Sequence, residues 1–485
     1  MPQRPFSRDE PWVLPPSIEE LVPDDHPVRF VACFVDSLPP AAWDALGIRE
    51  AASRGAPRYA PELVLLVWLA GFMQGIRTTR KLAYACRYDL TFRWLTSGQT
   101  PDHNTLWRFY AAHRDAMRSL LRQSVLTAIQ AGLADLAEQA VDGTKVLAQA
   151  ARERSLTVAE WQQAETRIAA VLAELESAQY GDDEPPPPNL PADLASQQAL
   201  RARITAALAQ VDGADPDTRI ALSDPEARMM KTRTGVRPGY NAQAVVVALD
   251  AEQAGCTGRL MLATAVTAAA DDHAQLAPMI AAAQLPDQPV PLTLADGGYH
   301  SGKMLAACAA GYRVVLPEAQ STAQRQQPYH KEQFTCDAEA DILRCPAGQV
   351  LTKRGSSQRK DGRLMTTSRA AAPVCAACAV RAECTTNTRQ GRAVQLGAYE
   401  AELRAHRQWM ATAEAQQASQ RRGPLIEAVF GTLKEQWRGQ RFLMRGLRKV
   451  RAEWALLAVG YNLRTLARVW ATNAAFRTAL GGGVA

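Results

Sequence analysis

Glu427 lies in the stretch RRGPLIEAVFGTLKEQWRGQRF, residues 421–442, with arginines and apolar residues on both sides of it. If this stretch is a helix of about 3.6 residues per turn, Glu427, Lys434 and Arg438 share one face. Such an acid is either the partner of Arg422 or Lys434 in a surface ion pair, or one ligand of a metal ion whose other ligands lie far away in the sequence. The other acids of the chain decide between the two.

Two further acids lie where an α/β sheet presents catalytic groups. Asp142 sits in the strand-like stretch AVDGTKVLA, and Asp296 ends the apolar run PLTLA ahead of two glycines. Three converging carboxylates suit hard cations such as Mg²⁺ or Mn²⁺, and two such ions about 3.5 to 4 Å apart support phosphoryl transfer on nucleic acid. For each Asp alone, the alternative is a turn or a helix cap. Asp224 is a rival third acid, with a structural role through capping or an ion pair with Arg228 as its alternative.

The elements that must position these acids alternate between strand and helix. Residues 140–148, 235–250 and 259–268 have the β-branched content of strands, and residues 291–318 are typical of strand, turn, helix and strand. This alternation predicts an α/β core. The chain then ends in long helices from about residue 400 to 473.

Two helical regions accompany this core. Residues 59–110 read as short helices, with Pro61 in a first turn, and resemble either a helix-turn-helix layout or a plain helical bundle. Residues 150–178 and 194–211 also favour helix and flank the proline-rich stretch 181–191, which cannot continue a helix. This pattern predicts an antiparallel helical hairpin inserted into a larger domain.

Composition and charge narrow the class of protein. A chain of 485 residues with 47% hydrophobic and 21% charged residues predicts a folded protein of several domains. The longest apolar stretch, residues 63–73, is too short to span a membrane, and no secretory signal opens the chain, so we expect a cytoplasmic protein without a membrane partner. Residues 401–485 hold 14 Arg and Lys against 5 Asp and Glu, a net charge of +9. This excess indicates a polyanionic partner, with a solvated helix face as the alternative.

Five of the nine cysteines cluster at 320–400, a segment with few large apolar residues that we expect to be rich in loops. Cys375 and Cys378 have the spacing of a thiolate clamp, and Cys345 and Cys384 complete a four-thiolate structural Zn²⁺ site. An unliganded cluster and a catalytic thiol are the alternatives. Cys336 has no partner at close spacing and stays outside the predicted site.

Several motifs match a known family in order and spacing. VDGTKV, SDPEARMMKTRTGVRPGYNAQAVV, LADGGYHSGKM and IEAVFGTLK, followed by RFLMRGLRKVRAEWALLAVGYNLRTL, resemble the DDE transposases of bacterial insertion sequences. The helical hairpin and the cysteine-rich insertion are most similar to the insertion sequence eleven-eighty-two group. The family signature has a Lys seven residues after its Glu, matched by Lys434, and an Arg four residues before it, where this chain has Gly423.

The resemblance implies an α/β fold with an RNase H-like catalytic core, in which Asp142, Asp296 and Glu427 bind Mg²⁺ or Mn²⁺. The chain would then bind the terminal inverted repeats of its element, cleave DNA by hydrolysis and join it to target DNA by transesterification, as a homodimer or larger assembly associated with the nucleoid. Trp437 is expected either to stack on a base or to pack in the core. The expected DNA-binding residues are Arg422, Lys434, Arg438, Arg441 and Arg445, with Arg448, Lys449 and Arg451 continuing the basic surface.

Two other functions fit the same motifs. A structure-specific DNA nuclease would use the same acids without strand joining, and a catalytically inactive chain would only bind DNA. The expected domains are an N-terminal helical, DNA-binding domain at 1–130, an RNase H-like core at 131–319 and 401–475 with the helical hairpin at 150–215, and a cysteine-rich insertion at 320–400.

Overall fold

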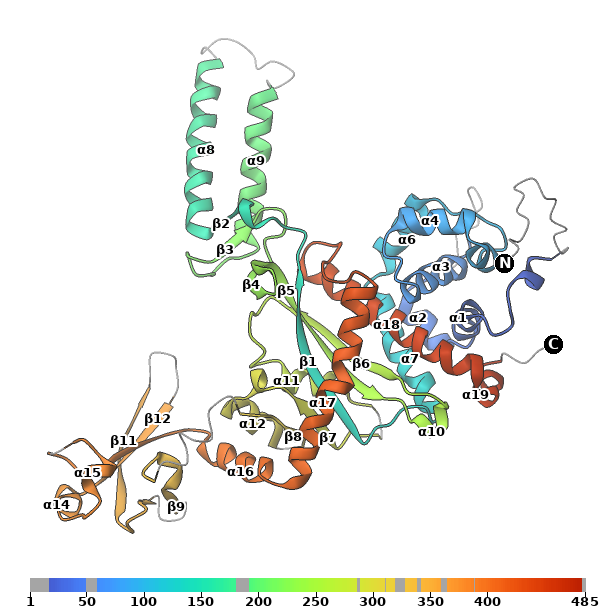
Figure 1. Cartoon of the computed structure of the whole chain (residues 1–485). Coiled ribbons are helices and arrows are strands. Elements are labelled where there is room, and N and C mark those ends of the chain that lie inside the picture. The colour runs from blue at the N-terminus through green and yellow to red at the C-terminus, as the bar shows by residue number, and fades with distance from the viewer. Residues whose placement is uncertain are drawn as a thin grey trace, which may run out of the picture. The chain divides into compact units, whose positions relative to one another are not determined.

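The computed structural model of the chain divides into two compact units (Figure 1). Unit 1 consists of Met1–Asp271, Met279–Val290 and Gly423–Ala485, and unit 2 of Asp272–Pro278 and Pro291–Arg422. Both contain helices and strands, so the mixed α/β class is confirmed, whereas the domain limits expected from the sequence stay a prediction. The structure describes residues 17–48, 59–179, 192–285, 288–309, 311–318, 328–337, 342–358, 364–387 and 389–481.

Short helices form the N-terminal part of unit 1, and prolines mark where three of them begin. Pro27, Pro40 and Pro61 each stand in the first turn, where a missing N–H leaves no hydrogen bond unmade. Asp89 and Asp102 cap two later helices by accepting backbone N–H groups. The helices are α1 (Pro27–Asp36), α2 (Pro40–Leu46), α3 (Pro61–Met73), α4 (Thr79–Tyr88), α5 (Leu90–Leu95), α6 (His103–His113) and α7 (Ser119–Gln130).

An antiparallel sheet forms the centre of unit 1, with β5 (Gly235–Ala248) paired along both edges. β1 (Glu138–Leu147) follows one edge, while β4 (Arg228–Thr232) and β6 (Arg259–Thr267) share the other. β5 is buried over residues 238–247, as a strand covered on both faces requires. The strands expected from the sequence in this region are confirmed, with ends shifted by a few residues.

The long helix α18 (Leu447–Thr472) covers this sheet and packs against the N-terminal helices. The indole N–H of Trp454 donates to the backbone oxygen of Gln243, at 3.0 Å. A Cβ atom at Gly460 would lie 2.6 Å from the carbonyl carbon of Phe72, so a glycine is required where α18 passes α3. α18 therefore joins the N-terminal helices and the sheet into one packed body.

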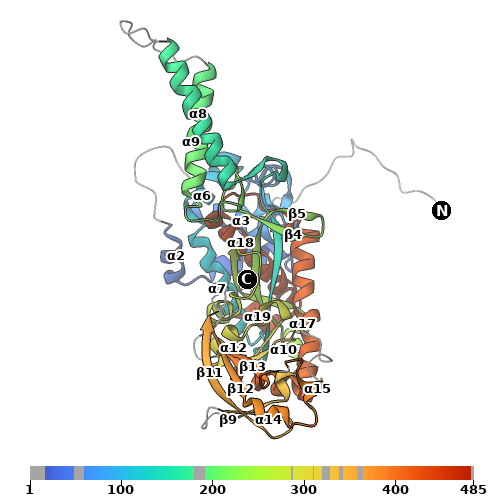
Figure 2. The same cartoon turned by 90° about the vertical axis from the view of Figure 1, so that its left-hand side faces the viewer.

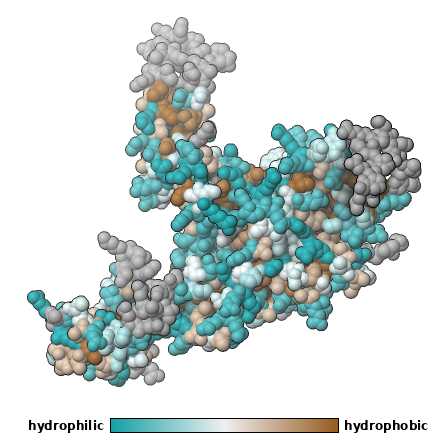
Figure 3. All heavy atoms as spheres, in the orientation of Figure 1, coloured by the Kyte–Doolittle hydropathy of each residue, from teal (hydrophilic) through white to brown (hydrophobic). Residues whose placement is uncertain are grey.

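Unit 1 also carries a helical hairpin. Figures 1 and 2 show α8 (Val158–Gln179) and α9 (Ala192–Ala209) side by side, and Arg201 of α9 pairs with Glu165 of α8. Hydrophobic residues gather on its visible face (Figure 3). The proline-rich stretch 181–191 lies outside the described residues. At the base of the hairpin, β2 (Ser155–Thr157) pairs with β3 (Arg219–Ala221), and Val158, Val211 and Ile220 form a small core beside Trp161.

Unit 2 contains a pair of parallel strands and a five-stranded sheet. In the first, β7 (Leu292–Ala295) and β8 (Arg313–Val315) are parallel and joined through α12 (Gly302–Ala309), which confirms the expected order of strand, turn, helix and strand. The second corrects the expectation of a loop-rich cysteine segment, because Phe334, Leu343 and Leu351 bury a core within five antiparallel strands. These strands are β9 (Thr335–Asp337), β10 (Ile342–Arg344), β11 (Val350–Gln358), β12 (Leu364–Ala370) and β13 (Ala393–Gly397).

The long C-terminal helices expected from the sequence are present. α16 (Glu400–Met410) precedes α17 (Ala413–Gly431), and a π-helical turn, Thr432–Gln436, follows α17 directly. After α18 the short α19 (Ala474–Ala479) ends the described chain. None of the described helices is long and apolar enough to cross a membrane.

Candidate active site and nucleic-acid interface

Asp142 stands in the middle of β1, the strand that unit 1 places beside β5. It lies opposite Ala244 in the register of these strands, and its Oδ1 accepts the backbone N–H of Gly143 at 2.7 Å. The preceding residues Ala140 and Val141 are fully buried, whereas Asp142 is half-buried. The buried residues Ala140 and Val141 thus fix the backbone of β1, while the carboxylate of Asp142 stays partly exposed.

Lys434 is bound to the same strand. It lies in the π-helical turn after α17, and its Nζ donates to the Oγ1 of Thr144 at 3.0 Å and to the backbone oxygen of Lys145 at 3.4 Å. Burial lowers the pKa of Lys434, and the nearby charge of Arg233 lowers it further. Because residues two apart on a strand point to the same face, Lys434 contacts the face of β1 that carries Asp142.

Glu427 has an exposed carboxylate without a protein partner. Within the described ranges it makes no hydrogen bond and no ion pair, and Lys434 bonds to β1 instead. The surface ion pair considered from the sequence is therefore wrong. Gly423 lies one helical turn earlier, and a Cβ atom there would lie 3.2 Å from Oε1 of Glu427. The glycine leaves room beside a carboxylate that is free to bind an outside cation, which fits a hard metal ion.

Asp296 belongs to unit 2 and follows β7 directly. Its Oδ1 accepts the backbone N–H of Gly298 at 2.9 Å, so the side chain caps the short 3₁₀ helix Gly297–Tyr299. A Cβ atom at Gly298 would lie 2.9 Å from the same oxygen, so the glycine makes this close approach possible. Asp296 thus acts as a cap, the alternative considered for it, and one of its oxygens is engaged in the turn.

Asp224, the rival third acid, has a structural role. It is fully buried and accepts the hydroxyl of Tyr240 at 2.6 Å and the backbone N–H of Gly446 at 3.0 Å. Burial raises its pKa. Arg228 donates to the backbone oxygens of Pro225 and Ala227 instead, so the expected ion pair with Asp224 is not formed. Asp224 anchors Gly446, the residue directly before α18.

The expected basic face is divided between a turn and a loop. Arg438 has left-handed backbone angles, with φ at 53°, after the π-helical turn has ended, so it does not share a helical face with Glu427. Arg441 donates to the backbone oxygen of Ala148, and Arg445 is exposed in the loop before α18. Arg422 lies in unit 2 and is half-buried. Of the residues expected along the following helix, Arg448, Lys449 and Arg451 lie on α18.

A buried ion pair that the sequence analysis missed holds this loop. Arg77 and Glu453 form a salt bridge in which only 6% and 4% of their side chains are exposed. Arg77 also donates to the backbone oxygens of Arg438 and Arg441, and Glu453 accepts the backbone N–H of Leu443 at 3.0 Å. The signal in the sequence is a single acid within the apolar stretch of α18, which needs a partner once buried. We call residues 438–445, so anchored, the basic loop.

Trp437 is a core residue, which removes the stacking role considered for it. Only 5% of its surface is exposed, its ring packs edge-on against Tyr461, and a Cβ atom at Gly75 would lie 2.8 Å from it. No face of this indole is therefore open to a base.

Four cysteines line one small cavity of about 20 Å³ in unit 2. Burial raises the pKa of Cys384. The charge of Arg392 lowers this pKa, and the neighbouring thiols raise it. Two backbone N–H groups point at sulfur, from Gln349 to Cys345 at 3.3 Å and from Arg392 to Cys375 at 3.4 Å. Cys336 is exposed on β9 and does not line this cavity. The cavity-lining cysteines are Cys345, Cys375, Cys378 and Cys384.

Neither the acids nor the cysteines form a ready metal site among the described residues. Across the described ranges, no group of three or more His, Cys, Asp or Glu side chains is arranged so that it could hold a metal ion.

Two family models match parts of the chain. The model described as a Transposase DDE domain matches residues 344–467, and the model described as a Transposase domain (DUF772) matches residues 16–112. Together the two matches support a DDE-type insertion-sequence transposase. No curated protein and no solved structure matches it.

The transposase is accordingly an enzyme that cleaves DNA and transfers strands, and DDE transposases use divalent metal ions, typically Mg²⁺. Glu427, Lys434 and the four cysteines of the small cavity lie in the segment matched by the DDE domain, whereas Asp142 and Asp296 lie outside both matched segments. The DUF772 segment includes Arg77 and therefore one half of the ion pair that anchors the basic loop.

Proposed function

We propose that this transposase binds the terminal inverted repeats of its own element, cleaves their 3′ ends and joins them to target DNA on an RNase H-like core. We assign it to the insertion sequence eleven-eighty-two group, with which the DUF772 match is consistent. Asp142, Asp296 and Glu427 are proposed to hold the Mg²⁺ or Mn²⁺ ions. The observation that carries this proposal is the unpaired carboxylate of Glu427 beside the space at Gly423.

The chemistry is two successive phosphoryl transfers. Water attacks the phosphorus at the element end, and the bond to the 3′ oxygen breaks to leave a 3′-hydroxyl. That hydroxyl then attacks a target phosphorus, and the 3′ oxygen of the target strand leaves. Divalent ions at the acids would activate the attacking oxygen and stabilise the leaving one.

Basic residues of the chain are proposed to hold the DNA during both steps. Lys434 supplies a fixed charge on the Asp142 face of β1, where it can contact the phosphate that reacts. Arg422, Arg438, Arg441 and Arg445 are proposed to contact other phosphates. Because two element ends must be joined to one target, we expect at least a dimer in the complex with DNA.

The first test compares cleavage of a labelled duplex carrying the element end, with Mg²⁺, by the wild type and by Glu427→Gln. We expect the variant to bind the duplex as the wild type does and to lose cleavage by about 10³-fold or more. Glu435→Gln is the matched control, because Glu435 is an exposed acid in the adjoining turn whose carboxylate is engaged by Gln440. Equal cleavage by Glu427→Gln and the control would refute the metal-ligand role of Glu427.

The same substrate separates the alternative functions. A structure-specific nuclease would release cleaved ends but produce no joined product when target DNA is added. A catalytically inactive chain would bind the duplex and leave it intact at every Mg²⁺ or Mn²⁺ concentration.

A second experiment tests whether the three acids share metal ions. Its readout is cutting of the protein backbone and does not depend on DNA cleavage. Fe²⁺ replaces Mg²⁺, and hydroxyl radicals made at the bound iron cut the backbone nearby. We expect cuts close to Asp142, Asp296 and Glu427 in the wild type and their joint loss in Glu427→Gln. Cuts that persist at Asp142 and Asp296 in the variant would show that Glu427 binds no shared ion.

We also propose a structural Zn²⁺ bound by Cys345, Cys375, Cys378 and Cys384. The support is their common cavity and the two N–H groups directed at sulfur, which stabilise thiolates. Elemental analysis should find one zinc per chain, and Cys378→Ser should lower this content, while Cys336→Ser should not. Equal zinc content in the two variants, or a fully folded and active metal-free protein, would exclude the site.

A further inference from the structure

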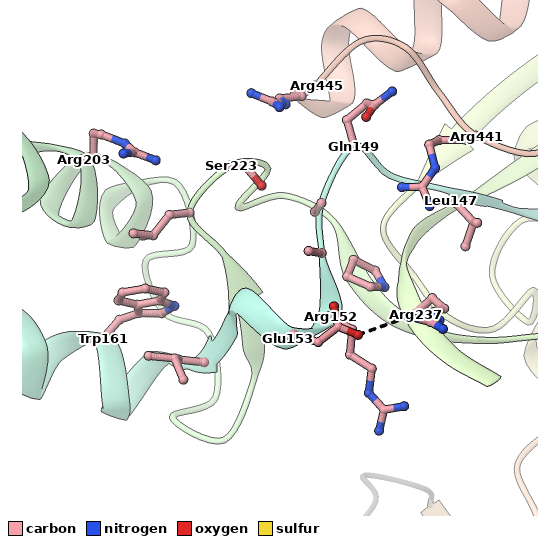
Figure 4. A pocket seen from close by; sticks show the side chains of 15 residues that line it. Leu147, Gln149, Arg152, Glu153, Trp161, Arg203, Ser223, Arg237, Arg441 and Arg445 are labelled. Carbon is pink, nitrogen blue, oxygen red and sulfur yellow. Dashed lines mark hydrogen bonds and ion pairs between the residues drawn. The ribbon is translucent and has the colours of Figure 1, made fainter. Parts of the chain in front are cut away.

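A large cavity of about 750 Å³ lies in unit 1 where β1 ends. Figure 4 shows its walls: Leu147 ends β1 and Gln149 follows it, Trp161 and Arg203 come from α8 and α9 of the helical hairpin, and Arg445 comes from the basic loop. The cavity is therefore built from three stretches of the chain, within residues 147–161, 203–238 and 441–445. We call it the arginine cavity.

The lining of the arginine cavity is strongly positive. It contains one acid, Glu153, which is already paired with Arg237 at 3.4 Å (Figure 4). Arg152, Arg203 and Arg445 are exposed, and among the described residues none of the three makes a hydrogen bond or an ion pair. The five arginines of the lining are Arg152, Arg203, Arg237, Arg441 and Arg445.

Unpaired guanidinium groups in the lining of one cavity are suited to a phosphate-bearing ligand. Each guanidinium presents a planar set of N–H donors that matches two phosphate oxygens at once. In Figure 4, Arg203 and Arg445 extend into the cavity from opposite walls. Trp161 cannot supply a polar contact, because its indole N–H donates to the backbone oxygen of Ile220, so its ring forms an apolar part of the wall. Recognition at this site therefore rests on charge.

The place of the cavity relative to Asp142 indicates which phosphates it would take. Leu147 is five residues after Asp142 on β1, which corresponds to about 17 Å at about 3.4 Å per residue. Successive phosphates of a duplex strand are also about 3.4 Å apart along the axis. A duplex that follows β1 from a cleavage site at Asp142 would reach the cavity about five base pairs away.

We propose that the arginine cavity binds the phosphate backbone of the DNA end about five base pairs from the cleaved bond, with Arg152, Arg203 and Arg445 as phosphate ligands. The helical hairpin then serves as one wall of the DNA-binding surface. This inference rests on the proposed function for the identity of the DNA, and the binding itself is independent of the catalytic acids.

The test measures the affinity for the labelled element-end duplex in EDTA at several salt concentrations. For the double variant Arg152→Ala/Arg203→Ala we expect weaker binding and a salt slope, log K against log salt, that is smaller by about two, because each phosphate contact contributes about one. Arg201→Ala is the matched control: Arg201 is on the same helix, pairs with Glu165 and does not line the cavity. Its slope should equal that of the wild type. An unchanged slope in the double variant would overturn the proposal.

A second measurement locates the contact. Single phosphates of the duplex are replaced by neutral methylphosphonates, one position at a time. We expect the wild type to lose affinity when the replacement is about five nucleotides from the cleaved bond, and the double variant to lose none there. Equal losses in both proteins at every position would overturn the assignment.

The two proposals fail in distinguishable ways. If Glu427→Gln cleaves like the wild type while the double variant loses two units of salt slope, the arginine cavity stands and the catalytic assignment falls. If Glu427→Gln loses cleavage while the double variant binds like the wild type, the catalytic assignment stands and the cavity proposal falls.

Discussion

Lys434 and Thr144 are 290 positions apart in the chain, and the Nζ of the lysine donates to the hydroxyl of the threonine at 3.0 Å. Thr144 is the second residue after Asp142 on β1, so this bond fixes a positive charge on the face that carries the acid. Lys434 also lies in the π-helical turn that directly follows α17, the helix that carries Glu427. One hydrogen bond therefore ties the helix of one proposed catalytic acid to the strand of another.

The first prediction concerns this lysine. We expect Lys434→Met to slow cleavage by about 10²-fold or more, because it removes one fixed charge that would stabilise the reacting phosphate. Single-turnover cleavage with saturating protein separates this loss from weaker binding. Lys231→Met, at an exposed lysine on β4, is the control and should cleave like the wild type. Equal rates for the two variants would show that Lys434 serves only to pack α17 on β1.

The second prediction concerns the space beside Glu427. Gly423→Ala puts a methyl group 3.2 Å from Oε1 of Glu427, so we expect cleavage to fall several-fold and to recover in part at higher Mg²⁺ concentration. The free energy of unfolding should change by less than about 1 kcal/mol, because the helix preference of alanine is opposed by the proline that follows it.

The control for this variant is Gly431→Ala. Gly431 is one helical turn on the other side of Glu427, and a Cβ atom there meets nothing within 4 Å. Its cleavage rate should match that of the wild type. A similar loss of cleavage in both variants would point to a general effect on α17.

The third prediction concerns the buried pair Arg77 and Glu453. Arg77→Met leaves Glu453 buried without its cation, and we expect the free energy of unfolding to drop by about 3 to 5 kcal/mol. DNA binding should weaken as well, because Arg77 also holds the backbone of the basic loop. Denaturant unfolding of the wild type, Arg77→Met and Arg80→Met, whose arginine is exposed on α4, measures the effect. A loss no larger than that of Arg80→Met would contradict it.

The fourth prediction concerns the pH dependence of stability. Burial raises the pKa of Asp224 above 3.8, its ordinary value, so its proton is held more tightly in the folded state. The stability that this proton contributes is complete below pH 3.8 and is lost as the pH rises through the raised pKa of the folded state. Asp224→Asn has no such proton, so the wild type should lose stability relative to the variant as the pH rises. Unfolding free energies that run parallel across this range would refute the shift.

Elements that depend on short-range pattern could be predicted. The strands around Asp142 and after residue 235 follow from β-branched and apolar runs, and α3 begins at Pro61 because proline suits a first helical turn. The prediction of a loop-rich cysteine segment was wrong, because its strands are largely polar and their pairing depends on a small core that includes Phe334. The prediction that Arg438 shares a helical face with Glu427 was also wrong. The π-helical turn that ends before Arg438 leaves no periodic pattern in the sequence.

The amino-acid sequence determined which residues carry charge and which local segments become helix or strand, because both depend on neighbours within a few positions. Only the tertiary structure decided their partners. It paired Lys434 with Thr144, Arg77 with Glu453 and Asp224 with Tyr240. Within the part of the chain that the structure describes, it left Glu427 and Arg203 unpaired. Such pairings follow from packing between segments far apart in the chain. A buried charge without a partner raises the free energy of the folded state, whereas an exposed charge is stabilised by water.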